Sequence, residues 1–157
     1  MSQRSLREGT LTIKEGGGYS VTVGLGDGNI TWSEKRNIEY ILDRGQISGS
    51  ITRLGEDQPC EVSFDFIWDW LMHENLSGDD SIVEMIKGTG TNATSTGATC
   101  EPYACDLVFV LTDSCDSKEE TITFSDFRYT DISYDPKTGM ISCSGACQQV
   151  APVVTNT

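Results

Sequence analysis

The sequence predicts a mainly β fold, a β-sandwich or barrel-like arrangement of antiparallel sheets with one short α-helix. Most of the chain alternates apolar and polar side chains with the period of two typical of half-buried strands, and glycine-containing turns separate these runs. The 157 residues are enough for one domain with its own core. We expect a single domain over residues 1–157, with a flexible N-terminus at about 1–8, a long loop at 88–104 and a short C-terminal tail at about 152–157.

The turns between the runs favour consecutive antiparallel hairpins. The sequences GDGN (26–29) and DRGQ (43–46) supply glycine where a positive φ is expected, and YDPKTGM (134–140) has proline early and Gly139 late, as in a type I turn closed by a bulge. The expected strands, of which the run from 119 is bent or bulged, lie near 10–14, 19–25, 29–33, 38–42, 46–53, 60–70, 105–112, 119–134 and 140–150.

One segment has helical signals instead. In SGDDSIVEMIKGTG, Ser81 followed by Glu84 matches a capping box, and Lys87 with Gly88 suits a helix C-terminus. The apolar residues between these ends share one helical face. We expect a helix at about 81–87 that packs against a sheet, its apolar face formed by Ile82, Met85 and Ile86.

Two runs alternate most clearly, and we expect them to be neighbouring strands that share a core face and a polar face. In QISGSIT (46–52), Ile47 and Ile51 face one way, opposite Gln46, Ser48, Ser50 and Thr52. In CEVSFDFIWDW (60–70), the apolar face is Val62, Phe64, Phe66, Trp68 and Trp70, and the opposite face is Glu61, Ser63, Asp65, Ile67 and Asp69. Such a polar surface resists anions and offers little to bind.

The charge balance excludes some classes of function. The chain carries 11 Lys and Arg against 24 Asp and Glu, for a formal charge of -13. Nucleic-acid affinity comes mainly from cationic side chains that release counterions, so this chain is not built to grip phosphate. No signal-peptide or membrane-length apolar stretch is visible, so we expect a chain without export signal or membrane insertion.

Catalytic motifs do not emerge from the sequence. The single histidine, His73, has no second imidazole for a catalytic zinc site, and neither a phosphate-cradle nor a nucleophile-elbow motif occurs. Glu61, Asp65 and Asp69 lie on one strand face, but successive members are about 13 Å apart, beyond the roughly 9.5 Å of an inverting glycosidase pair. We expect no enzyme activity and no cofactor.

Six cysteines leave two readings open: reduced thiols or a disulfide framework. The pairs in CEPYAC (100–105) and CSGAC (143–147) resemble metal-binding knuckles. However, Cys143 and Cys147 lie about 13 Å apart on one face of an expected strand, so a shared metal would require that strand to bend. We therefore expect buried, inert thiols and no metal site.

One order of tracts runs along the chain: EKRNIEYILDRG (34–45), an acidic loop, QPCEVSFDF (58–66), the short helix, a loop containing cysteine and glycine, CDLVFVLTD (105–113) and EETITFSDFRYTDISYDPKTGMISCSGACQQV (119–150). In these tracts and their order, nearly the whole chain, residues 9 to 152, resembles the tail tube proteins of long-tailed bacteriophages. The resemblance implies subunits that form hexameric rings, stacked into a tube through which the genome passes. The six cysteines have no place in the family pattern, so bridges between subunits stay open.

The resemblance also implies partners, a location and candidate residues. The chain would bind copies of itself, the tape measure and tube-end proteins, would meet DNA only in transit, and would lie in the virion tail after assembly in the host cytoplasm. An acidic wall would repel DNA phosphates. The lumen candidates are Ser48, Ser50, Thr52, Glu61, Ser63, Asp65 and Asp69, and the inter-subunit candidates are Arg44, Glu56 and Ile67.

Two alternatives remain at this stage. The first is a plain acidic β-domain whose polar strand faces meet solvent, as one face of an antiparallel sheet commonly does. The second is an extracellular, disulfide-containing β-sandwich for binding or adhesion, with a ligand site in the 88–104 loop. This second alternative requires intramolecular bridges and a monomer.

Overall fold

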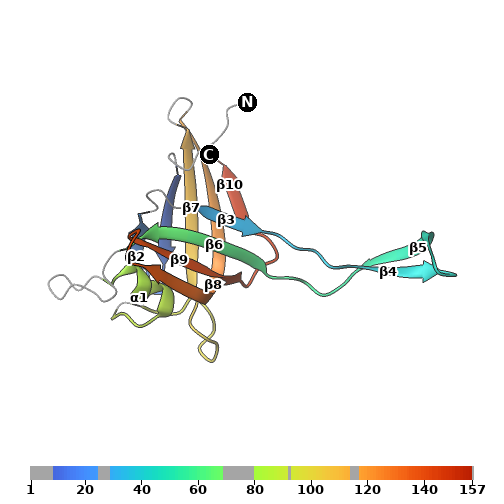
Figure 1. The fold of residues 1–157 in the computed structure, drawn as a ribbon, viewed down its shortest axis with the longest axis horizontal. Coiled ribbons are helices and arrows are strands. Elements are labelled where there is room, and N and C mark those ends of the chain that lie inside the picture. Colours follow the sequence, from blue (N-terminus) through green and yellow to red (C-terminus); the bar gives the residue numbers. More distant parts are fainter. Residues whose placement is uncertain (1–8, 25–28, 69–79, 92, 114–116, 157) are drawn as a thin grey trace.

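The structure is a computed structural model, and it describes residues 9–24, 29–68, 80–91, 93–113 and 117–156. Every strand expected from the sequence has a counterpart, and the mainly β, antiparallel fold with one short helix is confirmed (Figure 1). The elements are β1 (Gly9–Lys14), β2 (Ser20–Val23), β3 (Ile30–Ser33), β4 (Ile38–Asp43), β5 (Gln46–Leu54), β6 (Cys60–Ile67), α1 (Ile82–Lys87), β7 (Cys105–Asp113), β8 (Lys118–Asp135), β9 (Met140–Cys147) and β10 (Val153–Asn156).

One antiparallel sheet holds most of the strands, in the order β2-β1-β7-β8-β9-β6-β3, with β10 added beside β8. The segment expected as a C-terminal tail thus contains a strand, paired from Val153 opposite Thr123 to Asn156 opposite Glu120. Within the described residues the sheet does not close into a barrel, because β2 and β3 end its path.

The sheet has two halves that share the long strand β8: one half contains β2, β1, β7 and β10, and the other contains β9, β6 and β3. The first part of β8 pairs with β7 and β10, and its second part pairs with β9. The backbone turns between these parts, where Asp126 has a φ of 54° and the register shifts on both sides. The bend expected near 119–134 is therefore confirmed, and it lets the two halves enclose one core.

Aromatic contacts join the two halves across the core. The Trp32 ring of β3 meets Phe124 of β8 at 5.3 Å between centroids, and Phe64 of β6 lies 6.0 Å from Phe127 of β8. The alternation in β6 is confirmed by burial, since Val62, Phe64 and Phe66 are at most 1% exposed. Such a core sets the position of every outward-facing side chain on β6 and β9.

Helix α1 begins and ends as its sequence signals predict. Ser81 accepts a hydrogen bond from the Glu84 N–H and the Glu84 side chain accepts one from the Ser81 N–H, which completes the capping box. Gly88, with a φ of 73°, ends the helix in the left-handed conformation. The helix packs on β1, β2 and β8 and buries its apolar side chains in the core at one end of the sheet, namely Ile82, Val83, Met85 and Ile86. No helix in the described residues has the length and apolarity to cross a membrane.

Candidate assembly surfaces

The hairpin β4–β5 stands away from the sheet at the end of two connecting segments (Figure 1). We call residues 38–54 the arm, and the large sheet with α1 the body. Arg44 and Gly45 form the turn at the tip with φ values of 51° and 75°, so the positive φ expected for DRGQ is confirmed. The arm pairs only with itself within the described residues.

Two expectations for the arm are wrong. Ile47 and Ile51 do not face the core, because they are 71% and 68% exposed. Strand β5 is not a neighbour of β6, since β6 lies between β3 and β9. The structure therefore separates Ser48, Ser50 and Thr52 on the arm from Glu61, Ser63 and Asp65 on the body.

The arm exposes apolar side chains on both of its faces. Residues directly opposite each other on paired strands share a face, so Ile38 with Leu54 and Tyr40 with Thr52 form one face. Ile41 with Ile51 and the ion pair of Glu39 with Arg53 form the other. Large exposed apolar groups of this kind mark an interaction surface. The arm residues concerned are Tyr40, Ile41, Leu42, Ile47, Ile51 and Leu54, each 48% exposed or more.

The outward face of the body over β3, β6, β9 and the second part of β8 is rich in hydroxyls and carboxylates. The pairing aligns Thr31 with Ser63, Ser63 with Ser144, and Asp65 with Ser142. The Ser142 hydroxyl donates to the Asp65 carboxylate at 2.6 Å. We call this set the polar face; it comprises Thr31, Ser33, Glu61, Ser63, Asp65, Thr130, Asp131, Ser133, Ser142 and Ser144.

The polar face has two open hollows. One, of about 460 Å³, has Thr31, Glu61 and Ser144 in its lining; the other, of about 410 Å³, has Asp65 and Ser133. The Lys35 ammonium lies 3.0 Å from Glu61, and both side chains are more than half exposed, so this ion pair contributes little to stability. The residues that define the polar face include the carboxylates Glu61, Asp65 and Asp131 and no Lys or Arg, so its negative charge disfavours contact with polyanions.

The lumen candidates on β6 lie in this polar face, and three β-strands contribute residues that sequence reasoning missed. Ser142 and Ser144 on β9 and Ser133 on β8 follow the alternation of their strands, which indicates that they share an outward face. That β9 pairs with β6 could not be predicted locally, because the two strands lie about 80 residues apart in the sequence. Asp69 lies outside the described residues.

The three inter-subunit candidates are dispersed. Arg44 is exposed at the tip of the arm, and Glu56 is exposed where the chain returns to the body. Ile67, 47% exposed, lies opposite Met140 at the end of β6, and its N–H donates to the Gly24 carbonyl at 2.8 Å. The structure does not bring these three residues together.

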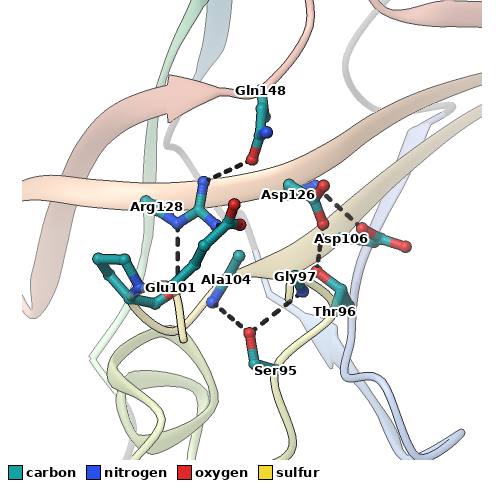
Figure 2. A network of polar contacts seen from close by, with 10 residues as sticks. Ser95, Thr96, Gly97, Glu101, Ala104, Asp106, Asp126, Arg128 and Gln148 are labelled. Atoms are coloured by element: carbon teal, nitrogen blue, oxygen red, sulfur yellow. Dashed lines mark hydrogen bonds and ion pairs between the residues drawn. The ribbon is translucent and has the colours of Figure 1, made fainter. Parts of the chain in front are cut away.

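The 88–104 loop is tied to the body by polar contacts (Figure 2). Ser95 accepts hydrogen bonds from the N–H groups of Gly97 and Ala104, and Thr96 donates to Asp126 at 2.7 Å. Arg128 extends from β8 to three acceptors: Glu101, Gln148 and the Pro102 carbonyl. These contacts hold residues 95–104 against the body, next to the bend of β8.

The five cysteines within the described residues are free, and four of them are buried; Cys115 lies outside these residues. Burial raises the pKa of the Cys143 and Cys147 thiols to about 12, and it also raises the pKa of the Cys105 thiol. At neutral pH these groups are thiols and not thiolates, which makes them slow in disulfide exchange. The described residues hold no group of three metal-ligating side chains.

Comparison with solved structures finds chains with a similar fold. One similar chain comes from the sheath/tube terminator, in its extended state, of PVC, an extracellular contractile injection system. Its TM-score is 0.55 at 9% sequence identity, and the match covers 100% of this chain and 98% of that one. A chain from the AFP tube terminating cap, the anti-feeding prophage cap, has a TM-score of 0.53 at 12% identity, covering 100% and 92%. This chain thus shares its fold with components of contractile injection systems. No family model and no curated protein matches its sequence.

Proposed function

We propose that the chain is a structural, non-catalytic subunit of a phage tail tube that self-assembles into stacked hexameric rings. The fold supports this proposal because the two similar chains come from tube-end assemblies of contractile injection systems. Its partners are copies of itself, the tape measure and tube-end proteins, with no membrane insertion. Its location is the virion tail, after assembly in the host cytoplasm.

One observation carries the proposal: the arm presents Ile41 and Ile51 on one face and Tyr40 and Leu54 on the other, all at least 48% exposed. An isolated two-stranded hairpin is marginally stable in water, and an exposed apolar one invites aggregation. A ring of identical subunits removes both problems, since each arm then packs against a neighbour.

The polar face supplies the wall of the channel in this proposal. Duplex DNA carries one negative charge per roughly 1.7 Å of its axis, so carboxylates at Glu61, Asp65 and Asp131 repel it, and hydroxyls offer it no cation. The genome therefore passes without being held. The arm residues Ser48, Ser50 and Thr52 lie apart from this wall, and in the proposal they serve contacts between subunits.

Negative-stain electron microscopy of the purified full chain at rising concentration tests the proposal. We expect rings and stacked tubes with an open centre. A chain that stays monomeric under all conditions contradicts it.

A further inference from the structure

We propose that strand β10 is the docking site for the arm of a second copy of this chain, which adds to its free edge as a further strand. This inference rests on the proposed function, because it names the surface through which the subunits join. It places an apolar arm from one copy on an apolar edge of the next.

Strand β10 offers an edge with uncovered apolar side chains. Among the residues that the structure describes, it pairs only with β8, and all four of its residues are exposed, with Val153 at 53% and Val154 at 49%. Val150, just before it, is 41% exposed. The two strands that end the sheet path differ, because their apolar residues are buried, as Val23 and Ile30 are, or partly buried against the core, as Val21 and Trp32 are. Of these edges, β10 alone combines free backbone groups with exposed valines.

The sequence around β10 lacks the charges that protect exposed edges. Natural sheet edges are commonly blunted by lysine, other charged residues or bulges. Residues 140–157 contain no Lys, Arg, Asp or Glu, although the chain carries 35 such residues in all. Pro152 precedes the strand and leaves its N–H groups intact. An unguarded edge is suited to pairing with another strand.

Charge favours the arm as the occupant. The segment 34–57, which holds the arm and its connections, has four basic and five acidic side chains, whereas the rest of the chain has seven and nineteen. Two copies of so acidic a body repel each other. The arm is close to neutral and the residues of β10 itself carry no charge, so the arm approaches β10 on a second body at little electrostatic cost. Apolar side chains on the two faces of the arm then lie beside Val153 and Val154, which point to opposite faces of the sheet.

The donor and the acceptor are different surfaces, so the contact is head-to-tail. Such a contact propagates from copy to copy and closes into a ring when the rotation allows it. It also makes the two halves of the interface separable by mutation. A chain with a defective acceptor still has a working arm, and a chain with a defective arm still has a working acceptor.

The test uses three variants of the full chain, each checked for folding by circular dichroism and followed by sedimentation velocity. The acceptor variant is Val153→Lys with Val154→Lys, the donor variant is Ile51→Lys with Leu54→Lys, and the control is Thr22→Lys on the exposed edge of β2. We expect the acceptor and donor variants to be monomeric alone and to form a heterodimer, and nothing larger, when mixed. The control assembles like the wild-type chain.

Two results overturn the inference while leaving the proposed function intact: an acceptor variant that assembles like the wild-type chain, and a mixture that stays monomeric. The first means that the arm docks elsewhere, for example on another arm. A wild-type chain that never assembles defeats the proposed function as well.

Cross-linking gives a second readout that needs no lysine on β10. Mild oxidation of an Ile51→Cys chain with a Val154→Cys chain, both carrying Cys100→Ser, yields a disulfide between positions 51 and 154, and its absence from assembled material contradicts the docking.

Discussion

Strands β5 and β6 alternate in the same way along the sequence and end in opposite environments. Phe64 and Phe66 of β6 are 1% and 0% exposed, whereas Ile47 and Ile51 of β5 are 71% and 68% exposed. The difference lies in their neighbours, since β6 lies between two strands of the body and β5 pairs only with β4. Alternation shows which side chains share a face. It does not show whether the surface that covers this face belongs to the same chain.

The largest expected effect comes from removing an aromatic side chain from the body. Phe64→Ala leaves a cavity among Phe66, Phe127 and their neighbours and lowers the free energy of unfolding by about 3–5 kcal/mol. Ile51→Ala on the arm changes it by less than about 0.5 kcal/mol, because the side chain is exposed. Urea denaturation of the monomer measures both. Equal destabilisation would show that the arm packs within its own chain.

The next effect concerns the buried carboxylate of Glu15, which joins β1 to the 88–104 loop. It accepts hydrogen bonds from the N–H groups of Tyr19 at 2.6 Å and Thr94 at 3.0 Å. Burial raises the pKa of Glu15, but these bonds and one from Gly17 outweigh it, so the pKa lies below 4.5. Glu15→Gln weakens these hydrogen bonds and costs about 1–3 kcal/mol of stability near neutral pH.

The lowered pKa of Glu15 fixes the sign of its pH dependence. The folded state binds this proton less readily than the unfolded state, so the contribution to stability is present above pH 4.5 and is lost as the pH falls through the folded-state value. We expect the stability difference between the wild-type chain and Glu15→Gln to shrink over that range. Thermal unfolding at several pH values measures it, and a pH-independent difference would contradict this assignment.

A third effect tests the proposal that the polar face is a channel wall that does not hold DNA. Glu61→Lys with Asp65→Lys reverses two charges on exposed or half-buried side chains, so folding and tube assembly should continue. We expect retention of short duplex DNA by assembled tubes to rise at least about tenfold at low salt, since cations on the wall release counterions from the duplex. Co-sedimentation measures retention. Glu61→Lys alone is compared with the control Glu119→Lys, which makes the same change of charge at an exposed residue on the first part of β8, and equal retention by these two variants would place the wall elsewhere.

The smallest effect is local to α1. Ser81→Ala removes the acceptor for the Glu84 N–H at 3.2 Å and lowers the stability of the body by about 1 kcal/mol. Ser81→Asp keeps an acceptor at the same place and serves as the control. Chemical denaturation measures both variants, and indistinguishable losses would mean that the cap does not stabilise the helix.

The sequence predicted the parts of the fold that depend on local rules. The capping box of Ser81 and Glu84 and the positive φ of Gly45 and Gly139 follow from residue types within a few positions of one another. The pairing of β6 with β9 and the placement of β10 beside β8 are long-range, and no local pattern specifies them.

The candidate site was predicted in part for the same reason. Alternation identified Glu61, Ser63 and Asp65 as outward-facing, because their strand neighbours are buried phenylalanines. It could not reveal that Ser142 and Ser144 complete the polar face, nor that Ile51 lies uncovered on an arm. In an assembling subunit the surface that covers an apolar face can belong to another copy, and one sequence does not distinguish the two cases.

Hydrogen–deuterium exchange before and after assembly tests the central claim most directly, namely that the arm is covered by another copy of the chain. In the monomer we expect the amides of residues 38–54 to exchange much faster than those of β6 and α1, because the arm hairpin is isolated. In the assembled state we predict strong protection of the arm, with α1 unchanged. An arm that exchanges equally fast in both states would contradict the account.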